Sequence, residues 1–182
     1  MDGIGQFNMI FAGLKRFIGL SQARDRLDPL YGSITAIARQ PHWYQKGAVP
    51  DNVEGRFEMV ALILSLLLLR LESEGGNGAT QASLLTEVFI ADMDGQMRED
   101  GIGDAGVGMR MGKMMSALGG RISVYRTGIE QGDLQAALTR NLYRGAPPEE
   151  NVLDGVEGEV MQLVRDLAAL PLDMILVGRL SA

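Results

Sequence analysis

Three glycines form the first pattern in this sequence that suggests a chemical role. Gly101, Gly103 and Gly106 spell G-x-G-x-x-G within EDGIGDAGVG, the spacing with which dinucleotide-binding folds hold a pyrophosphate. That site needs a strand before the first glycine and an acidic residue about 20 positions later. The preceding QASLLTEVFIADMDGQMRED has helical periodicity, and Gly119, Gly120 and Arg121 follow at the later position. The glycines are therefore predicted to form a turn between two helices, with Asp104 capping the second helix.

Few other residues have the types and spacing of a catalytic or metal-binding group. The chain has no Cys and one His, which excludes a thiolate nucleophile and a multi-histidine metal site. His42 lies beside a proline-containing loop without a nearby Ser or Asp suited to a triad. Asp92 and Asp94 are two positions apart on a predicted helix, so they point to different sides and do not form a carboxylate pair. We expect no catalytic residues, no metal and no cofactor, and hence a protein that is not an enzyme.

The overall composition is that of an ordinary globular domain. The chain has 182 residues, of which 46% are apolar and 22% charged, enough for one domain with a sizeable core. The net charge of −6 disfavours binding to nucleic acid phosphates. The longest apolar run, Met59 to Leu69, would rise only about 16 Å as a helix, against about 30 Å for a membrane core. We therefore expect no membrane span.

Helical periodicity covers nearly the whole chain. Residues 1–27 are predicted to form an amphipathic helix and a linker, and residues 28–182 a helical domain. Asp28 and Pro29 mark the start of a helix that Pro41 ends. The segment 54–74 is apolar nearly all round, which predicts a central buried helix. Three further helices are expected. The first starts at Thr80 after the loop EGGNG, the second follows Asp104, and the third covers residues 151–170. The predicted fold is all-α, a single-domain bundle of about six to eight helices.

Soft and small side chains gather around the predicted turn. The methionines are Met93, Met97, Met109, Met111, Met114 and Met115, and the glycines that share one strip of the second helix are Gly108, Gly112 and Gly119. Methionine is common at adaptable binding surfaces, and aligned glycines let another helix approach closely. Packing inside the domain explains the same pattern, so both interpretations stay open. Arg110, Lys113 and Arg121 lie opposite and are predicted to face solvent.

Two blocks of the sequence resemble one protein family. The segments ARQPHWYQKGAVPDNVEGRFEMVALILSLLLLRL and LLTEVFIADMDGQMREDGIGDAGVGMRMGKM are similar, in order and spacing, to the ubiquinol–cytochrome c chaperones. The matching positions of the first block are Arg39, Pro41, Tyr44, Pro50, Asp51, Gly55, Arg56 and Phe57. Those of the second block are Phe89, Asp92, Met93, Asp94, Arg98, Gly101, Gly103, Asp104, Val107 and Gly108.

The resemblance implies a non-enzymatic assembly chaperone. Such a protein binds newly made cytochrome b and assists assembly of ubiquinol–cytochrome c reductase (respiratory complex III). The residues that we expect to bind the client or a partner are Met93, Met97, Val107, Met111 and Gly112. A second assembly subunit or self-association is also open. Since no targeting peptide is apparent, we expect the bacterial cytoplasm, peripherally at the inner membrane, or the matrix side if the protein is mitochondrial.

The first helix and the Asp104 helix start each suggest an alternative function. The chain also suits a small peripheral membrane protein anchored by its first helix, or an enzyme that binds an anion at the Asp104 helix start. Asp104 argues against the enzyme, because a capping carboxylate already uses the backbone donors that an anion would need. Finally, Arg56 at the start of the buried helix is expected to pair with Asp92 or Asp94, since a buried guanidinium requires a carboxylate.

Overall fold

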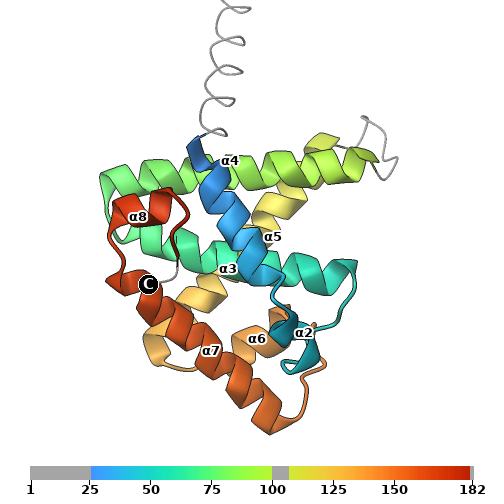
Figure 1. The fold of residues 1–182 in the computed structure, drawn as a ribbon. Coiled ribbons are helices and arrows are strands. Elements are labelled where there is room, and N and C mark those ends of the chain that lie inside the picture. The colour runs from blue at the N-terminus through green and yellow to red at the C-terminus, as the bar shows by residue number, and fades with distance from the viewer. Residues whose placement is uncertain (1–25, 100–106, 181–182) are drawn as a thin grey trace, which may run out of the picture.

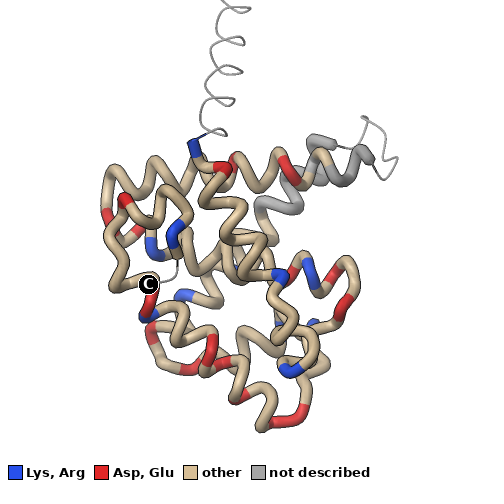
Figure 2. Tube along the Cα trace, in the orientation of Figure 1, with Lys and Arg blue, Asp and Glu red and all other residues tan. Residues whose placement is uncertain are grey.

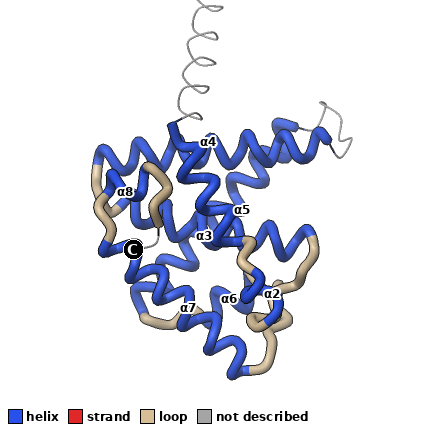
Figure 3. Tube along the Cα trace, in the orientation of Figure 1, coloured by secondary structure: helices blue, strands red, loops and turns tan. Residues whose placement is uncertain are grey.

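The structure is a computed structural model that describes residues 26–99 and 107–180, without the side chains of residues 94, 96–99 and 107–115. Within these ranges the chain consists of helices joined by loops, with no strand (Figure 3). A helix covers residues 26–38. It is followed by α2 (Pro41–Gln45), α3 (Val53–Glu72), α4 (Gly76–Glu99), α5 (Val107–Gln131), α6 (Gln135–Asn141), α7 (Glu150–Ala169) and α8 (Leu172–Leu176). The predicted all-α bundle is confirmed, and its number of helices agrees with the prediction.

Helix α3 lies at the centre of the molecule (Figure 1). Every residue from Met59 to Leu68 is buried, because α4, α5 and α7 all pack against this helix. Ser65 is the polar residue in that run, and its hydroxyl donates to the carbonyl oxygen of Ala61 at 2.6 Å. The prediction of a central buried helix is therefore confirmed. No helix of the described ranges is long and apolar enough to cross a bilayer.

The 26–38 helix belongs to the same core. Leu27, Leu30, Ile34 and Ala38 are buried together with α3, and Leu180 near the other end of the chain joins the same cluster. The described core thus reaches from residue 27 to residue 180. The predicted amphipathic helix of residues 1–27 lies outside the described residues up to position 25, so the boundary between it and the domain stays a prediction.

A buried ion pair joins α3 to α5. The carboxylate of Glu58 accepts a hydrogen bond from Nε of Arg121 at 2.7 Å and a second from the terminal nitrogen of the same guanidinium. The two side chains are only 9% and 18% exposed. The guanidinium also lies 5.7 Å from the ring centroid of Phe57. The prediction that Arg121 faces solvent is wrong, because a carboxylate at the start of the buried stretch needs a cationic partner.

Helix α4 begins earlier than predicted. Gly76, Asn77 and Gly78, which were expected to form a loop, make its first turn. A Cβ atom on Gly78 would lie 1.9 Å from the carbonyl oxygen of Leu71, so the end of α3 approaches this turn closely. Glycine permits that approach because it has no side chain. The tertiary contact outweighs the low helix propensity of the sequence.

Candidate functional site

Helix α2 is held against the end of the 26–38 helix by two aromatic side chains. Nε1 of Trp43 donates to the carbonyl oxygen of Ile37 at 2.9 Å, and the hydroxyl of Tyr44 donates to that of Ala38 at 2.7 Å. The last carbonyls of a helix have no intrahelical donor. Trp43 and Tyr44 supply donors there and so fix α2, and the residues beside it, relative to the preceding helix.

The loop between α2 and α3 is equally constrained. Asn52 caps α3 by accepting the Gly55 N–H at 2.8 Å. A Cβ atom on Gly55 would lie only 1.9 Å from the carbonyl oxygen of Pro50, so the backbone of this turn requires glycine. On the other side of the loop, the buried hydroxyl of Tyr143 donates to the carbonyl oxygen of Gly47 at 2.6 Å. Burial raises the pKa of Tyr143 to about 12.

These contacts bring residues of the first family block together around one surface hollow. Arg39, Pro41, Tyr44, Asp51 and Arg56, with Gln45, line a space of about 320 Å³, which we call the motif pocket. Oδ1 of Asp51 accepts hydrogen bonds from Nε of Arg56 at 2.7 Å and from its terminal nitrogen at 2.7 Å. Burial raises the pKa of Tyr44, and the nearby Arg56 opposes that rise. The pocket therefore contains two guanidinium groups and one carboxylate around a phenol.

The predicted pairing of Arg56 with Asp92 is wrong. The Arg56 guanidinium is more than half exposed and binds Asp51, so it does not need a partner from another buried helix. The carboxylate of Asp92 instead accepts the hydroxyl of Tyr31 at 2.8 Å, which links α4 to the 26–38 helix. The side chain of Asp94, the other predicted partner, lies outside the described residues.

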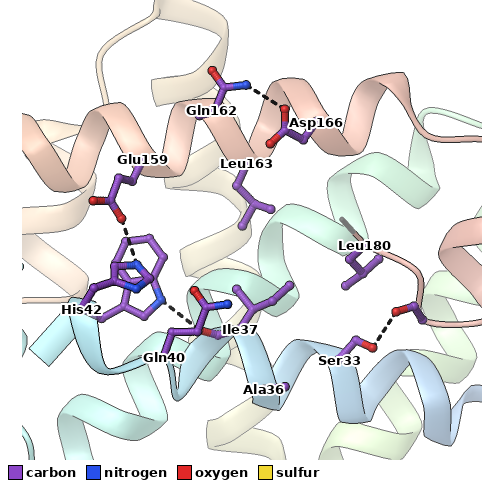
Figure 4. Close-up of a pocket in the computed structure, with 12 residues that line it drawn as sticks. Ser33, Ala36, Ile37, Gln40, His42, Glu159, Gln162, Leu163, Asp166 and Leu180 are labelled. Atoms are coloured by element: carbon purple, nitrogen blue, oxygen red, sulfur yellow. Dashed lines mark hydrogen bonds and ion pairs between the residues drawn. The ribbon is translucent and has the colours of Figure 1, made fainter. Parts of the chain in front are cut away.

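A larger hollow of about 610 Å³ lies between the 26–38 helix, α2, α7 and the C-terminal segment (Figure 4). His42 of α2 points toward Glu159 of α7, and Nε2 lies 2.9 Å from the carboxylate. Gln162 donates to Asp166 on the same wall at 2.7 Å, and Ser33 donates to the carbonyl oxygen of Gly178 at 2.7 Å. These polar groups bind one another, and no cluster of metal-ligating side chains occurs within the described ranges.

The glycine pattern that resembles a nucleotide site lies between two helices. Its first residues follow α4, which ends at Glu99, and α5 begins at Val107. A helix therefore occupies the position where a dinucleotide-binding fold has a strand. Residues 100–106, with Gly103 and Asp104, lie outside the described residues, so the turn and the Asp104 cap themselves stay predictions.

The structure describes part of the predicted client surface. Met93 is half-buried and packs against the core, while Phe89 is fully buried with its ring centroid 6.2 Å from that of Phe57. The side chains of Met97, Arg98, Val107 and Met111 are not among those described, and Gly112 lies in α5 within the segment whose surroundings are not described. A Cβ atom on Gly119 would meet nothing within 4 Å. At Gly119, therefore, the glycine strip of α5 faces open space and not the interior of the domain.

Comparisons with known proteins agree with the resemblance of the two blocks. The sequence model of the family described as "Ubiquinol-cytochrome C chaperone" matches residues 45–182. The solved structure described as the crystal structure of the Cbp3 homolog from Brucella abortus is similar to this chain, with a TM-score of 0.76 and 31% sequence identity. The match covers 92% of this chain and 94% of that chain. The comparison with curated proteins gave no match. Because the family model covers most of the chain, the protein belongs to the ubiquinol–cytochrome c chaperone family.

Proposed function

We propose that this protein is a non-enzymatic assembly chaperone that binds newly made cytochrome b and assists assembly of ubiquinol–cytochrome c reductase. The observation that carries the proposal is the family match over residues 45–182, supported by the likeness to the Brucella abortus protein over 92% of the chain. In the hollow of about 610 Å³, His42 and Gln162 bind neighbouring carboxylates and Ser33 binds a backbone carbonyl, which favours a binding protein over an enzyme. The expected client is a membrane protein, so the chaperone has to offer it apolar, adaptable surface.

The proposed client surface comprises Met93, Met97, Val107, Met111 and Gly112. Methionine side chains adapt to apolar partners of varied shape, and glycines on one strip admit a close helix backbone. Gly119, further along α5, is open to solvent, which supports an outward-facing strip. Transmembrane helices of cytochrome b would present the small and apolar side chains that suit such a surface.

Co-purification of cytochrome b with the tagged full-length chain tests the proposal. The substitution Gly112→Leu is expected to abolish co-purification while leaving the circular dichroism spectrum and the unfolding midpoint intact, because the new side chain would fill the groove. Gly158→Leu is the matched control, since Gly158 lies on α7 and has no atom within 4 Å of a Cβ. Unchanged binding by Gly112→Leu would refute this surface. An unfolded variant would show that the glycine strip packs internally.

We also propose where the protein works. It acts in the bacterial cytoplasm at the inner membrane, or on the matrix side in a mitochondrion, with its first helix resting on the lipid surface. The sequence supports this with an apolar stripe that includes Phe7 and Phe11 and with Lys15 and Arg16 at the end of that helix.

A further inference from the structure

The motif pocket has more positive than negative charge, in a chain whose net charge is −6. A basic residue lies where the 26–38 helix ends and another in the first turn of α3, beside acidic residues at the same end of α3, whereas acidic residues predominate along α7 (Figure 2). Arg39 and Arg56 face the pocket with Asp51 as the carboxylate among its lining residues. The pocket thus has two positively charged groups and one negatively charged group, an excess of one positive charge.

One of the two guanidinium groups is available for a ligand. Among the described side chains, that of Arg39 forms neither a hydrogen bond nor an ion pair. Arg56 binds Oδ1 of Asp51 through Nε and one terminal nitrogen. Guanidinium groups favour carboxylates because their planar forks match the two oxygens. The pocket therefore holds one partnered arginine beside one that an incoming carboxylate can bind.

The walls that carry these arginines are fixed before any ligand arrives. Tyr44, between them, donates its hydroxyl to the carbonyl oxygen of Ala38, which holds α2 in place. Arg39 follows the 26–38 helix directly, and Arg56 lies in the first turn of α3, whose start is set by the Asn52 cap. The backbone positions of both arginines are thus set in advance, so less backbone freedom is lost on binding.

We propose that the motif pocket receives a carboxylate side chain from an acidic segment of a partner protein. A carboxylate carries one negative charge and balances the excess of one positive charge in the pocket. A phosphate group would bring about −1.5 to −2 charges and overcompensate it. Val53, two residues along the chain from the pocket residue Asp51, is 81% exposed, so it is an apolar side chain that the partner segment can contact. The inference is independent of the client, because it concerns a polar pocket and not the apolar α4–α5 surface.

The test is an NMR titration of the full-length, nitrogen-15-labelled chain with the peptide acetyl-Glu-Leu-Glu-Leu-Glu-amide. We expect saturable shifts of the Nε–H signals of Arg39 and Arg56. Arg39→Gln and Arg56→Gln should each weaken binding by about fivefold or more, and raising salt from about 50 to about 300 mM should weaken it further. Arg140→Gln, an exposed arginine on α6, is the matched control and should change the affinity by less than about twofold. The Arg39 variant removes no described contact, so it remains a clean test even if the Arg56 variant is destabilised.

Several results would overturn the proposal. One is binding of the peptide with Gln in place of Glu at equal affinity, and another is the same loss for Arg39→Gln and Arg140→Gln. Absence of saturable shifts at the two arginines would also refute it. Tighter pocket binding by inorganic phosphate or by phosphatidylglycerol vesicles would assign the site to phosphate. A concentration-dependent dimer that Arg39→Gln abolishes would assign the carboxylate to a second copy of this chain.

Discussion

Gly55 lies in the first turn of α3, against the Pro50 carbonyl of the α2–α3 loop. We predict that Gly55→Ala lowers the free energy of unfolding by about 1–3 kcal/mol or more, because the added methyl group would meet the rigid Pro50 carbonyl. The distance that decides this is the 1.9 Å between the Cβ position and that oxygen. Urea denaturation measures the effect.

The control for this substitution is Gly158→Ala on the exposed face of α7, where a Cβ atom meets nothing within 4 Å. It should stabilise the protein by about 0.5–1 kcal/mol, since alanine favours a helix over glycine. Equal stability of Gly55→Ala and the natural chain would show that the loop can move away from α3.

Ionisation of Tyr143 makes the free energy of unfolding depend on pH in the alkaline range. Burial raises its pKa from 10.0 to about 12, so the folded state retains the proton longer than the unfolded state does. The resulting stabilisation is complete below pH 10 and is lost as the pH rises from 10 toward 12. We expect Tyr143→Phe to lose less stability across that window than the natural chain.

Denaturation at about pH 8 and about pH 11 measures the difference between the two slopes. At the lower pH, Tyr143→Phe should already cost about 1–3 kcal/mol, because the buried carbonyl of Gly47 loses a donor. Tyr125, whose pKa burial also raises, should preserve part of the alkaline transition. Identical slopes in the two proteins would contradict the role given to Tyr143.

Among the described elements, α3 contributes more residues to the core than any other. Leu66 is 2% exposed and lies on this central helix, so Leu66→Ala is expected to cost about 2–5 kcal/mol in unfolding free energy. Val53→Ala on the same helix is the control and should change stability by less than about 0.5 kcal/mol, because Val53 is exposed. A cost below about 1 kcal/mol for Leu66→Ala would contradict this prediction and show that neighbouring side chains fill the cavity left by the leucine.

The connection between α3 and α5 depends on the Glu58–Arg121 pair. Glu58→Leu and Arg121→Leu should each cost about 3 kcal/mol, because each leaves a largely buried charge unpaired. The double variant should lose clearly less than the sum, and a double-mutant cycle gives the coupling energy. Additive losses would show that the two charges act independently.

The sequence predicts the long helices better than the contacts between them. α7 follows from its apolar periodicity and from the Pro residues that flank it, and α3 follows from its long apolar run, since long segments of either kind have strong local signals. The short α2 and α6 depend on tertiary contacts such as the Trp43 and Tyr44 hydrogen bonds, because helices of this length are marginal alone.

The sequence identifies the residues of the candidate site, but it does not predict which of them lie together in space. Periodicity assigns Arg121 to the polar side of its helix, yet it cannot tell that α5 turns this side toward Glu58 of α3. Likewise, Arg56 was expected to bind a distant carboxylate, whereas Asp51, five residues earlier in the chain, is closer. The grouping of Arg39, Tyr44, Asp51 and Arg56 in one pocket depends on the docking of α2, which no sequence pattern encodes.

At the scale of the whole molecule, the described core runs from Leu27 to Leu180. We predict that a chain starting at residue 26 still unfolds in one cooperative transition, because it retains this core. The same chain should lose binding to phosphatidylglycerol vesicles in flotation, if residues 1–25 provide the membrane contact. A chain starting at residue 40 is the control, and it should not fold because it lacks Leu30 and Ile34. Vesicle binding by the chain from residue 26 would place the membrane contact elsewhere.

Trp43 has a use that follows from its position. It is the single tryptophan of the chain, it is 3% exposed, and its indole N–H binds the end of the neighbouring helix. All intrinsic indole emission of the protein therefore originates at α2, beside the hollow that Figure 4 shows. A ligand or partner that displaces α2 would shift the emission to longer wavelength while the α3 core stays folded. The unlabelled protein thus carries its own optical probe for occupancy of this face.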